Sequence, residues 1–367
     1  MKIGILTIPF NNNYGGFLQA YALTTVLRRM GHEVVIINRK RNLPFRTKLR
    51  KFVTFGIASR YEKMVKKISV NTDRFIAENL KTTHPLYSTK AIRRECVRQR
   101  FDCLIVGSDQ VWRYKYAKKS VEDYFFGFLD VSDDTPRFSY AASFGVDIQE
   151  YPIKVATYCG KFLKKFRAVS VREESAVALL EKHFFLQRLK AVVVVDPTFL
   201  LKQQDYQQLT IRYATETRGD YLFKYVLDET EDTIDICAQF QGKLCLPCQE
   251  IKAQTGNSAK QAIIEPVEKW VAEIACAKFV VTDSYHGTIF SILFNRPFVV
   301  VTNSTRGLTR IHHLLSHYHL TERMISESSA EVINEAVYNP IDWTSVNKQI
   351  IEDRAYSMDF IRRSLPS

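Results

Sequence analysis

Short apolar runs that alternate with helical stretches are the feature of this chain that most restricts its fold. Apolar runs of strand length stand at 2–7, 33–37, 102–106, 137–141, 168–171 and 192–195. Apolar residues at helical spacing fill intervals such as 16–30 and 61–79. Strands and helices that alternate in this way form parallel sheets covered by helices, because each helix carries the chain back to the start of the next strand. The sequence therefore predicts an α/β fold.

A second series of the same kind follows the polar stretch at 215–220. Strands are expected at 221–226, 243–246, 279–281 and 298–301, and helices at 231–240, 265–277 and 289–294. A length of 367 residues favours two domains. We expect an N-terminal Rossmann-like domain over 1–210, a C-terminal one over 211–328, and helices over 329–367 that pack back on the domain junction.

One histidine stands where ligands bind in such folds. His286 lies between the strand at 279–281 and the helix that follows. Turns of this kind lie at the carboxyl ends of parallel strands, where ligands bind. Gly287 allows a close backbone turn, and free N–H groups of Gly287, Thr288 and Ile289 would suit a phosphate or carboxylate. The sequence predicts a proton-carrying side chain beside an anion cradle, with a simple helix-capping histidine as the alternative.

Two glycines, Gly15 and Gly16, open a helix directly after the first strand. This is a position for a phosphate cradle, and close packing of loop against helix is the alternative. The turn contains neither G-x-G-x-x-G nor a Walker loop. We therefore expect no nucleotide cofactor.

Polar residues also follow the strands at 102–106 and 168–171. Ser108 and Asp109 leave the first of these strands, and Asp109 is a candidate base or hydroxyl acceptor, with an N-cap as the alternative. Arg172 leaves the second strand and is a candidate bidentate anion ligand. Its alternative is an ion pair with Glu173 or Glu174.

Two further arginines follow the strand at 298–301. Arg306 and Arg310 are one helical turn apart, and they would add positive charge to the same crevice. A role on the surface is the alternative.

The segment 39–67 carries much of the positive charge of the chain. It has eleven Lys and Arg against Glu62 alone, a local net charge of +10, interleaved with apolar residues. This pattern is expected of a patch on an anionic membrane surface, and a solvated basic loop and helix is the alternative. No nucleic-acid-binding fold accompanies it, so we expect no nucleic-acid partner.

Other features indicate a cytoplasmic protein, which the basic segment would bring to the inner face of the membrane. Seven cysteines at irregular spacing are typical of reduced thiols, and no signal peptide or apolar run of the ~18 residues needed to span a bilayer is found. Cys245 and Cys248 have the spacing of a zinc knuckle without a second pair. We expect no metal.

Six motifs in order resemble the polysaccharide pyruvyl transferase family. They are Tyr14-Gly15-Gly16 with Leu18-Gln19-Ala20, Val106 to Trp112, Ser139 to Gly145, Val171 to Ser175, Asp196-Pro197-Thr198 and Thr282 to Gly287. The resemblance spans about residues 1 to 320. It implies a GT-B-like fold, with two Rossmann-like domains facing across a cleft. It also implies transfer of a pyruvyl group from phosphoenolpyruvate onto two hydroxyls of a sugar, with release of phosphate. The acceptor would be a capsular, exopolysaccharide or cell-wall glycan precursor, often linked to a polyprenyl lipid.

The residues suit that chemistry. His286 is the candidate general acid, Asp109 the candidate base, and Arg172 a ligand for the anionic donor. Many family members carry an arginine where this chain has Ser284. Either Arg306, Arg310 or Lys278 supplies the charge, or the donor differs, or the reaction is lost. A GT-B glycosyltransferase that uses a nucleotide sugar and a non-catalytic glycan- or membrane-binding relative are the alternatives.

Overall fold

The computed structural model describes residues 1–10, 13–40, 64, 66–130, 132–184, 190–214, 219–252, 263–302, 308–326 and 329–366. Its first sheet is parallel, with the strand order β2-β1-β3-β4-β5-β6. These strands are β1 (Lys2–Leu6), β2 (Glu33–Ile36), β3 (Cys103–Val106), β4 (Arg137–Ala142), β5 (Ala168–Val171) and β6 (Val192–Val193). All six strands predicted in this half of the sequence are confirmed.

The second sheet is also parallel and has the order β11-β10-β9-β7-β8. Its strands are β7 (Leu222–Tyr225), β8 (Cys248–Glu250), β9 (Phe279–Thr282), β10 (Phe298–Val301) and β11 (Met324–Ile325). The strand predicted at 243–246 is wrong, because the preceding helix continues to Leu244 and Cys245 ends it in the left-handed conformation, with φ of 52°. The short edge strand β11 was not predicted.

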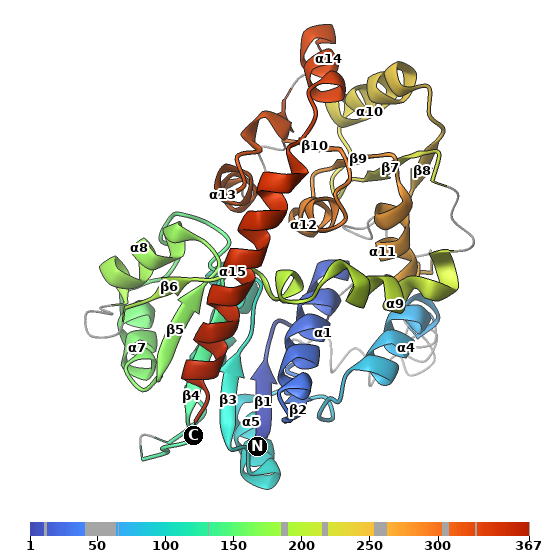
Figure 1. The fold of residues 1–367 in the computed structure, drawn as a ribbon. Coiled ribbons are helices and arrows are strands. Elements are labelled where there is room, and N and C mark those ends of the chain that lie inside the picture. The colour runs from blue at the N-terminus through green and yellow to red at the C-terminus, as the bar shows by residue number, and fades with distance from the viewer. Residues whose placement is uncertain are drawn as a thin grey trace, which may run out of the picture.

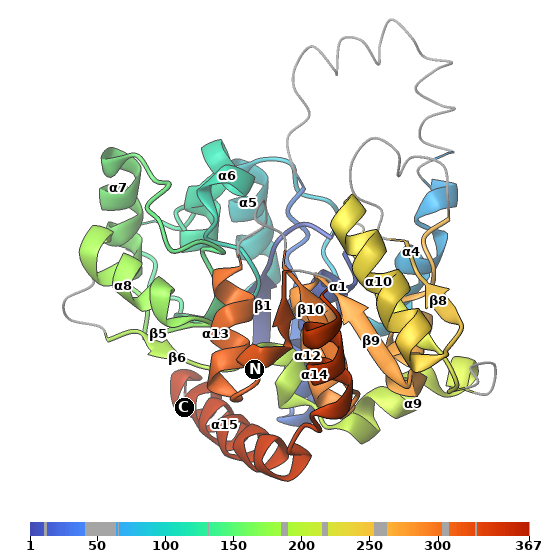
Figure 2. The same ribbon diagram turned by 90° about the horizontal axis from the view of Figure 1, so that it is seen from above.

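Helices cover both faces of both sheets (Figures 1 and 2). The helices are α1 (Tyr14–Arg29), α4 (Val70–Asn79), α5 (Thr89–Gln99), α6 (Tyr114–Ala117), α7 (Ile153–Leu163), α8 (Glu174–His183), α9 (Gln203–Ala214), α10 (Glu231–Leu244), α11 (Val267–Cys276), α12 (Tyr285–Leu293), α13 (Thr309–His317), α14 (Ala330–Tyr338) and α15 (Trp343–Ser364). The 3-10 segments are η1 (Lys118–Phe125), η2 (Pro197–Leu200) and η4 (Thr321–Arg323). No helix in the described part of the chain is long and apolar enough to span a membrane.

One hydrophobic cluster joins the inner faces of the two sheets. Ile3 and Ile5 of β1 belong to it, while Leu6 packs into a separate cluster on the opposite face of the first sheet, as strand alternation requires. Tyr14 of α1 stacks on Trp270 of α11, with ring centroids 5.3 Å apart. The two halves of the molecule are therefore packed directly against each other at the start of α1.

The last helix returns from the second sheet to the first. In Figure 1, α15 runs as one long helix from beside the second sheet down across β4. Arg354 donates hydrogen bonds to the carbonyls of Phe199 and Leu201, and the Ser357 hydroxyl accepts one from the Val195 amide. Through these contacts α15 packs on the N-terminal half, although it comes last in the sequence. A division of the chain into two domains near residue 210 therefore remains a proposal.

The basic segment 39–67 falls mostly outside the described residues. Arg39 is described and is buried, with 4% exposure, in an ion pair of 2.8 Å with Asp123. The expectation that Arg39 lies on an exposed basic surface is therefore wrong. Its guanidinium is needed to neutralise a buried carboxylate.

Candidate active site

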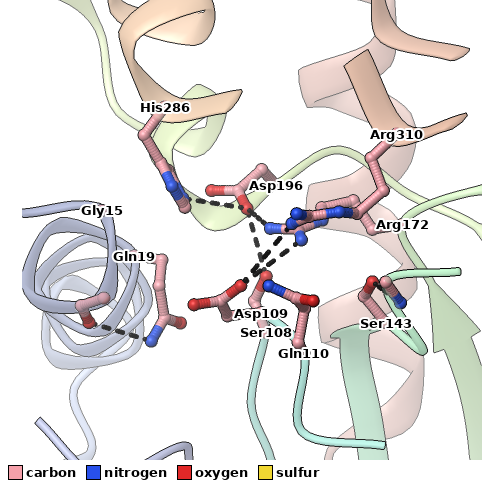
Figure 3. A network of polar contacts seen from close by, with 12 residues as sticks. Gly15, Gln19, Ser108, Asp109, Gln110, Ser143, Arg172, Asp196, His286 and Arg310 are labelled. Atoms are coloured by element: carbon pink, nitrogen blue, oxygen red, sulfur yellow. Dashed lines mark hydrogen bonds and ion pairs between the residues drawn. The ribbon is translucent and has the colours of Figure 1, made fainter. Parts of the chain in front are cut away.

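Two arginines flank one tyrosine ring where the two halves of the chain meet. Arg172 follows β5 in the first half, and Arg310 lies in the first turn of α13 in the second. Their guanidinium carbons lie 4.3 Å and 5.4 Å from the ring centroid of Tyr285. Cation–π attraction to one ring stabilises two like charges close together. Figure 3 shows the two guanidinium groups next to each other, both pointing toward Asp109.

Carboxylates surround Arg172, whose side chain is 1% exposed. It lies 2.6 Å from Asp196, 3.5 Å from Asp109 and 3.8 Å from Glu173. Burial lowers the pKa of Arg172, but Tyr285 and the three carboxylates together raise it above its usual value. Arg172 is thus a permanent cation. The ion pair with Glu173, predicted as its alternative role, is present together with the contacts to Asp109 and Asp196.

Asp196 lies at the centre of the arginine cluster, which consists of Asp109, Arg172, Asp196, Tyr285, His286 and Arg310. From the sequence we predicted no role for Asp196 beyond its place in a motif. Its Oδ2 accepts a hydrogen bond of 3.2 Å from the Ser108 hydroxyl, and its Oδ1 accepts two from Thr198. Burial raises the pKa of Asp196, but His286 and Arg172 lower it well below its usual range. Asp196 is therefore ionised at neutral pH. The apolar run that precedes Asp196 in the sequence marks it as another residue at a strand end.

His286 lies in the first turn of α12 and is 5% exposed. Its Nε2 is 3.6 Å from Oδ2 of Asp196, across the junction between the halves. Its ring also lies against Gly15 of α1, where an added Cβ would stand 1.9 Å from Nδ1. Gly15 is therefore required to admit the histidine ring, a contact with a distant part of the chain that differs from the expected packing of loop against helix.

The predicted anion cradle after β9 is wrong. The Gly287 amide donates to the Ser284 hydroxyl, and the Thr288 amide donates to the Ser284 carbonyl. A Cβ at Gly287 would stand 2.4 Å from Oγ1 of Thr282, so this glycine allows close packing on the strand. Ser284 is the N-cap of α12, which begins earlier than the predicted 289. These backbone groups are occupied in helix formation and capping.

The predicted cradle at the start of α1 is wrong for the same reason. The Gly15 amide donates to the side chain of Asn13, and the Gly16 amide donates to the Asn13 carbonyl. A Cβ at Gly16 would meet only Asn13 atoms, at 4.0 Å. Both glycine amides are already bonded within the chain.

The remaining predicted residues differ in whether they reach the arginine cluster. Arg310 reaches the cluster, with its Nη1 4.0 Å from Oδ1 of Asp109, whereas Arg306 lies outside the described residues. Lys278 precedes β9 at the end of the strand opposite to the cluster, and it pairs with Asp220 at 2.6 Å on the surface. Asp109 has a left-handed backbone, with φ of 70°, and it caps no helix, since α6 begins at Tyr114.

Several buried polar atoms of the cluster have no hydrogen-bond partner among the described residues. They are Nε and Nη2 of Arg172, Nε of Arg310, Oδ2 of Asp109 and Nε2 of His286. Buried polar groups in folded proteins are nearly always hydrogen-bonded, so a set of this kind indicates a polar ligand. Cationic donors suit an anion, and the carboxylate and the imidazole can exchange protons with it or with its reaction partner.

Comparison with known proteins gives a family match for the chain. The sequence profile of the family described as polysaccharide pyruvyl transferase matches residues 13–305. No curated protein matches the chain significantly.

Solved structures share the fold at low sequence identity. The UDP-GlcNAc 2-epimerase from Neisseria meningitidis, solved with UDP-GlcNAc bound, has a TM-score of 0.54 and 10% identity, covering 100% of this chain and 99% of that chain. The UDP-GlcNAc 2-epimerase from Methanocaldococcus jannaschii has a TM-score of 0.53 and 11% identity, covering 97% and 100%. A UGT transferase from Siraitia grosvenorii, in complex with UDP, has a TM-score of 0.51 and 10% identity, covering 100% of each. The predicted GT-B fold is confirmed.

Proposed function

Because this chain belongs to the polysaccharide pyruvyl transferase family, we propose that it transfers a pyruvyl group from phosphoenolpyruvate onto two hydroxyls of a sugar. The observation that carries the proposal is the arginine pair on Tyr285, with His286 and Asp109 beside it. Phosphoenolpyruvate has a carboxylate and a phosphate, and a site for it needs fixed cations next to a proton donor. The cluster supplies both groups at the junction of the two halves.

The reaction can be written with the residues present. His286 donates a proton to the methylene carbon of phosphoenolpyruvate, and the central carbon becomes electrophilic. One sugar hydroxyl attacks this carbon and loses its proton to Asp109. Phosphate then leaves with the electrons of the C–O bond and takes up the proton held by Asp109. The second hydroxyl attacks the same carbon and returns its proton to His286. The products are a cyclic ketal that carries a methyl and a carboxylate group, and inorganic phosphate.

Arg310 takes over the charge that the family arginine would supply at position 284. Ser284 caps α12 and has no charge to offer, whereas Arg310 contacts both Asp109 and the Tyr285 ring. Burial and the nearby Arg172 lower the pKa of Arg310, yet an arginine remains protonated in proteins. Two like charges held this close favour an anion between or beside them. This supports retention of an anionic donor despite Ser284.

The proposed acceptor is a precursor of a capsular, exopolysaccharide or cell-wall glycan, free or linked to a polyprenyl lipid. Contact with an anionic membrane surface through 39–67 would bring the enzyme to a lipid-linked acceptor. The charge of this segment supports that part of the proposal. Vesicle binding that survives deletion of 41–51 would refute the role of this segment.

The test is release of phosphate from phosphoenolpyruvate in the presence of candidate sugars. We expect release by the wild type and none above background by His286→Ala, with Lys278→Ala as the surface control. Equal release by wild type and His286→Ala would overturn the proposal. A thermal shift with UDP- or GDP-sugars and none with phosphoenolpyruvate would favour a nucleotide-sugar glycosyltransferase. Glycan binding that survives loss of both His286 and Arg172, without turnover, would indicate a non-catalytic relative.

A further inference from the structure

A cavity of about 290 Å³ lies beside the arginine cluster, on the N-terminal half. It opens at the carboxyl ends of three neighbouring strands, in the order β2-β1-β3. Asp109, after β3, lines this cavity and also contacts Arg172 and Arg310. The cavity and the cluster therefore share the carboxylate that we assign as the base.

Lys40, which follows the end of β2 at Ile36, also lines the cavity. The volume of the cavity is near the lower limit of ligand pockets, about 300 Å³.

Of the two cations that line the cavity among the described residues, Lys40 is the one without an ion pair. Arg39 is held by Asp123 at 2.8 Å. Lys40 forms no ion pair within the described ranges. Asp73 of α4 is the charged residue that acts electrostatically on its ammonium group. Burial lowers the pKa of Lys40, and Asp73 raises it. A half-buried ammonium of this kind gains most from an anionic partner.

The rest of the lining suits a saccharide. Tyr116 is 42% exposed, with the Arg113 guanidinium carbon 5.0 Å from its ring centroid, and Asn13, Gln110 and Ser120 offer amide and hydroxyl groups. Sugar rings bind where an aromatic face is combined with a few polar side chains. A sugar hydroxyl next to Asp109 would also be next to the donor site.

We propose that this cavity is the acceptor subsite and that it selects a sugar with an acidic substituent, whose charge is bound by Lys40. The acidic group is the carboxylate of a uronic acid or a phosphate on the ring. The inference rests on the proposed pyruvyl transfer, because that reaction defines the sugar as the acceptor. It assigns Lys40 a role in acceptor specificity and none in the chemical step.

The test uses three probes that share one ring: methyl glucoside, methyl glucuronide and glucose 6-phosphate. Calorimetric titration of the full-length protein should show at least one acidic probe binding about tenfold or more tightly than the glucoside, as expected for a charge-assisted bond. Lys40→Met should remove this preference, and Lys40→Arg should keep it. Lys81→Met, a surface lysine paired with Glu33, is the matched control and should behave as wild type.

Equal affinity for all three probes, absence of binding by any of them, or a preference that survives Lys40→Met would each overturn the assignment. Which acidic probe binds more tightly separates a uronic acid from a phosphorylated sugar. A thermal shift with phosphoenolpyruvate is measured on the same samples. A shift with phosphoenolpyruvate but no acidic-sugar preference rejects the subsite alone, whereas the absence of any such shift rejects the proposed donor.

Discussion

The two walls of the arginine cluster hold their charged groups in different ways. The N-terminal wall consists of Asp109, Arg172 and Asp196, and the C-terminal wall consists of Tyr285, His286 and Arg310. Ion contacts of 2.6 Å and 3.5 Å join Arg172 to the two carboxylates within the first wall. In the second wall, His286 and Arg310 have their nearest carboxylates across the junction, at 3.6 Å and 4.0 Å. The charged groups of the N-terminal wall are thus held in place by ion pairs within that wall. The charged groups of the C-terminal wall are oriented by carboxylates of the N-terminal wall.

In the proposed reaction, the C-terminal wall supplies the proton donor, His286. His286→Gln removes the proton donor but keeps the size of the side chain, so we expect kcat to fall about 10²- to 10⁴-fold. KM for phosphoenolpyruvate should change little. Steady-state phosphate release at several concentrations of phosphoenolpyruvate checks this. A variant that loses affinity and keeps kcat would make His286 a binding residue instead.

Loss of Arg172 should damage the N-terminal wall itself. Arg172→Ala leaves Asp109, Asp196 and Glu173 buried without their shared cation, and the free energy of unfolding should fall by about 3–5 kcal/mol. Arg310→Ala should cost much less, because its side chain is 14% exposed and has one carboxylate contact. Urea unfolding of both variants measures the difference. Equal losses would remove the distinction between the walls.

Gly15 tests how one wall positions the other. Gly15→Ala places a methyl group 1.9 Å from Nδ1 of His286, so the ring must move. A displacement of about 1 Å in a catalytic group can cost roughly 10²-fold in rate. Gly16→Ala is the matched control, with only Asn13 near the new methyl group, at 4.0 Å. Phosphate release should fall in the first variant only, and equal activity in both would show that the contact is unimportant.

Ser284 has a structural role in the C-terminal wall. Ser284→Ala removes the N-cap of α12, and we expect a loss of about 1 kcal/mol in the free energy of unfolding. The apparent affinity for phosphoenolpyruvate should stay the same, because Arg310 supplies the charge. Chemical denaturation and kinetics together test this. A large rise in KM would mean that the Ser284 hydroxyl itself binds the donor.

The smallest expected effect concerns the support of α13, the helix that carries Arg310. His317 of α13 lies 2.7 Å from Asp353 of α15, and this hydrogen bond raises the pKa of His317 although burial opposes it. A raised pKa in the folded state stabilises the fold below about pH 6.5, and the contribution is lost as the pH rises through the folded value. His317 is 43% exposed, so the contribution should stay below about 1 kcal/mol.

The measurement is the difference in free energy of unfolding between wild type and His317→Gln, at pH 6 and pH 9. The difference should be larger at pH 6. At both values Asp353 is ionised, because its pKa is lowered by His317, Gln349 and Tyr318 against the effect of burial. A difference that does not vary with pH would mean that the contact is a neutral hydrogen bond.

The sequence predicted the sheets well and the site in part, and the reasons differ. Each buried strand is a local pattern of apolar residues, and a parallel sheet places the ends of all its strands at one edge. The proximity of Asp109 and Arg172 follows from that rule. His286 follows a strand of the second sheet and comes near them because the two halves meet at the junction. The sequence could not show that the amides at the starts of α1 and α12 are already hydrogen-bonded. Asn13 and Ser284 accept these hydrogen bonds because of local capping geometry. Asp196 and Tyr285 were missed as site residues because their roles depend on contacts with residues far away in the sequence.

The return of α15 also affects how the protein can fold during synthesis. Phe360 of α15 packs near Phe138 and Tyr140 of β4, with ring centroids 6.3 Å and 6.4 Å away. The first sheet is translated early, but these aromatic side chains gain this cover only after α15 has left the ribosome. Chaperones and proteases can therefore act on this face for as long as α15 does not cover it. Truncation within α15 should lower the yield of soluble protein even when all the residues of the arginine cluster are present.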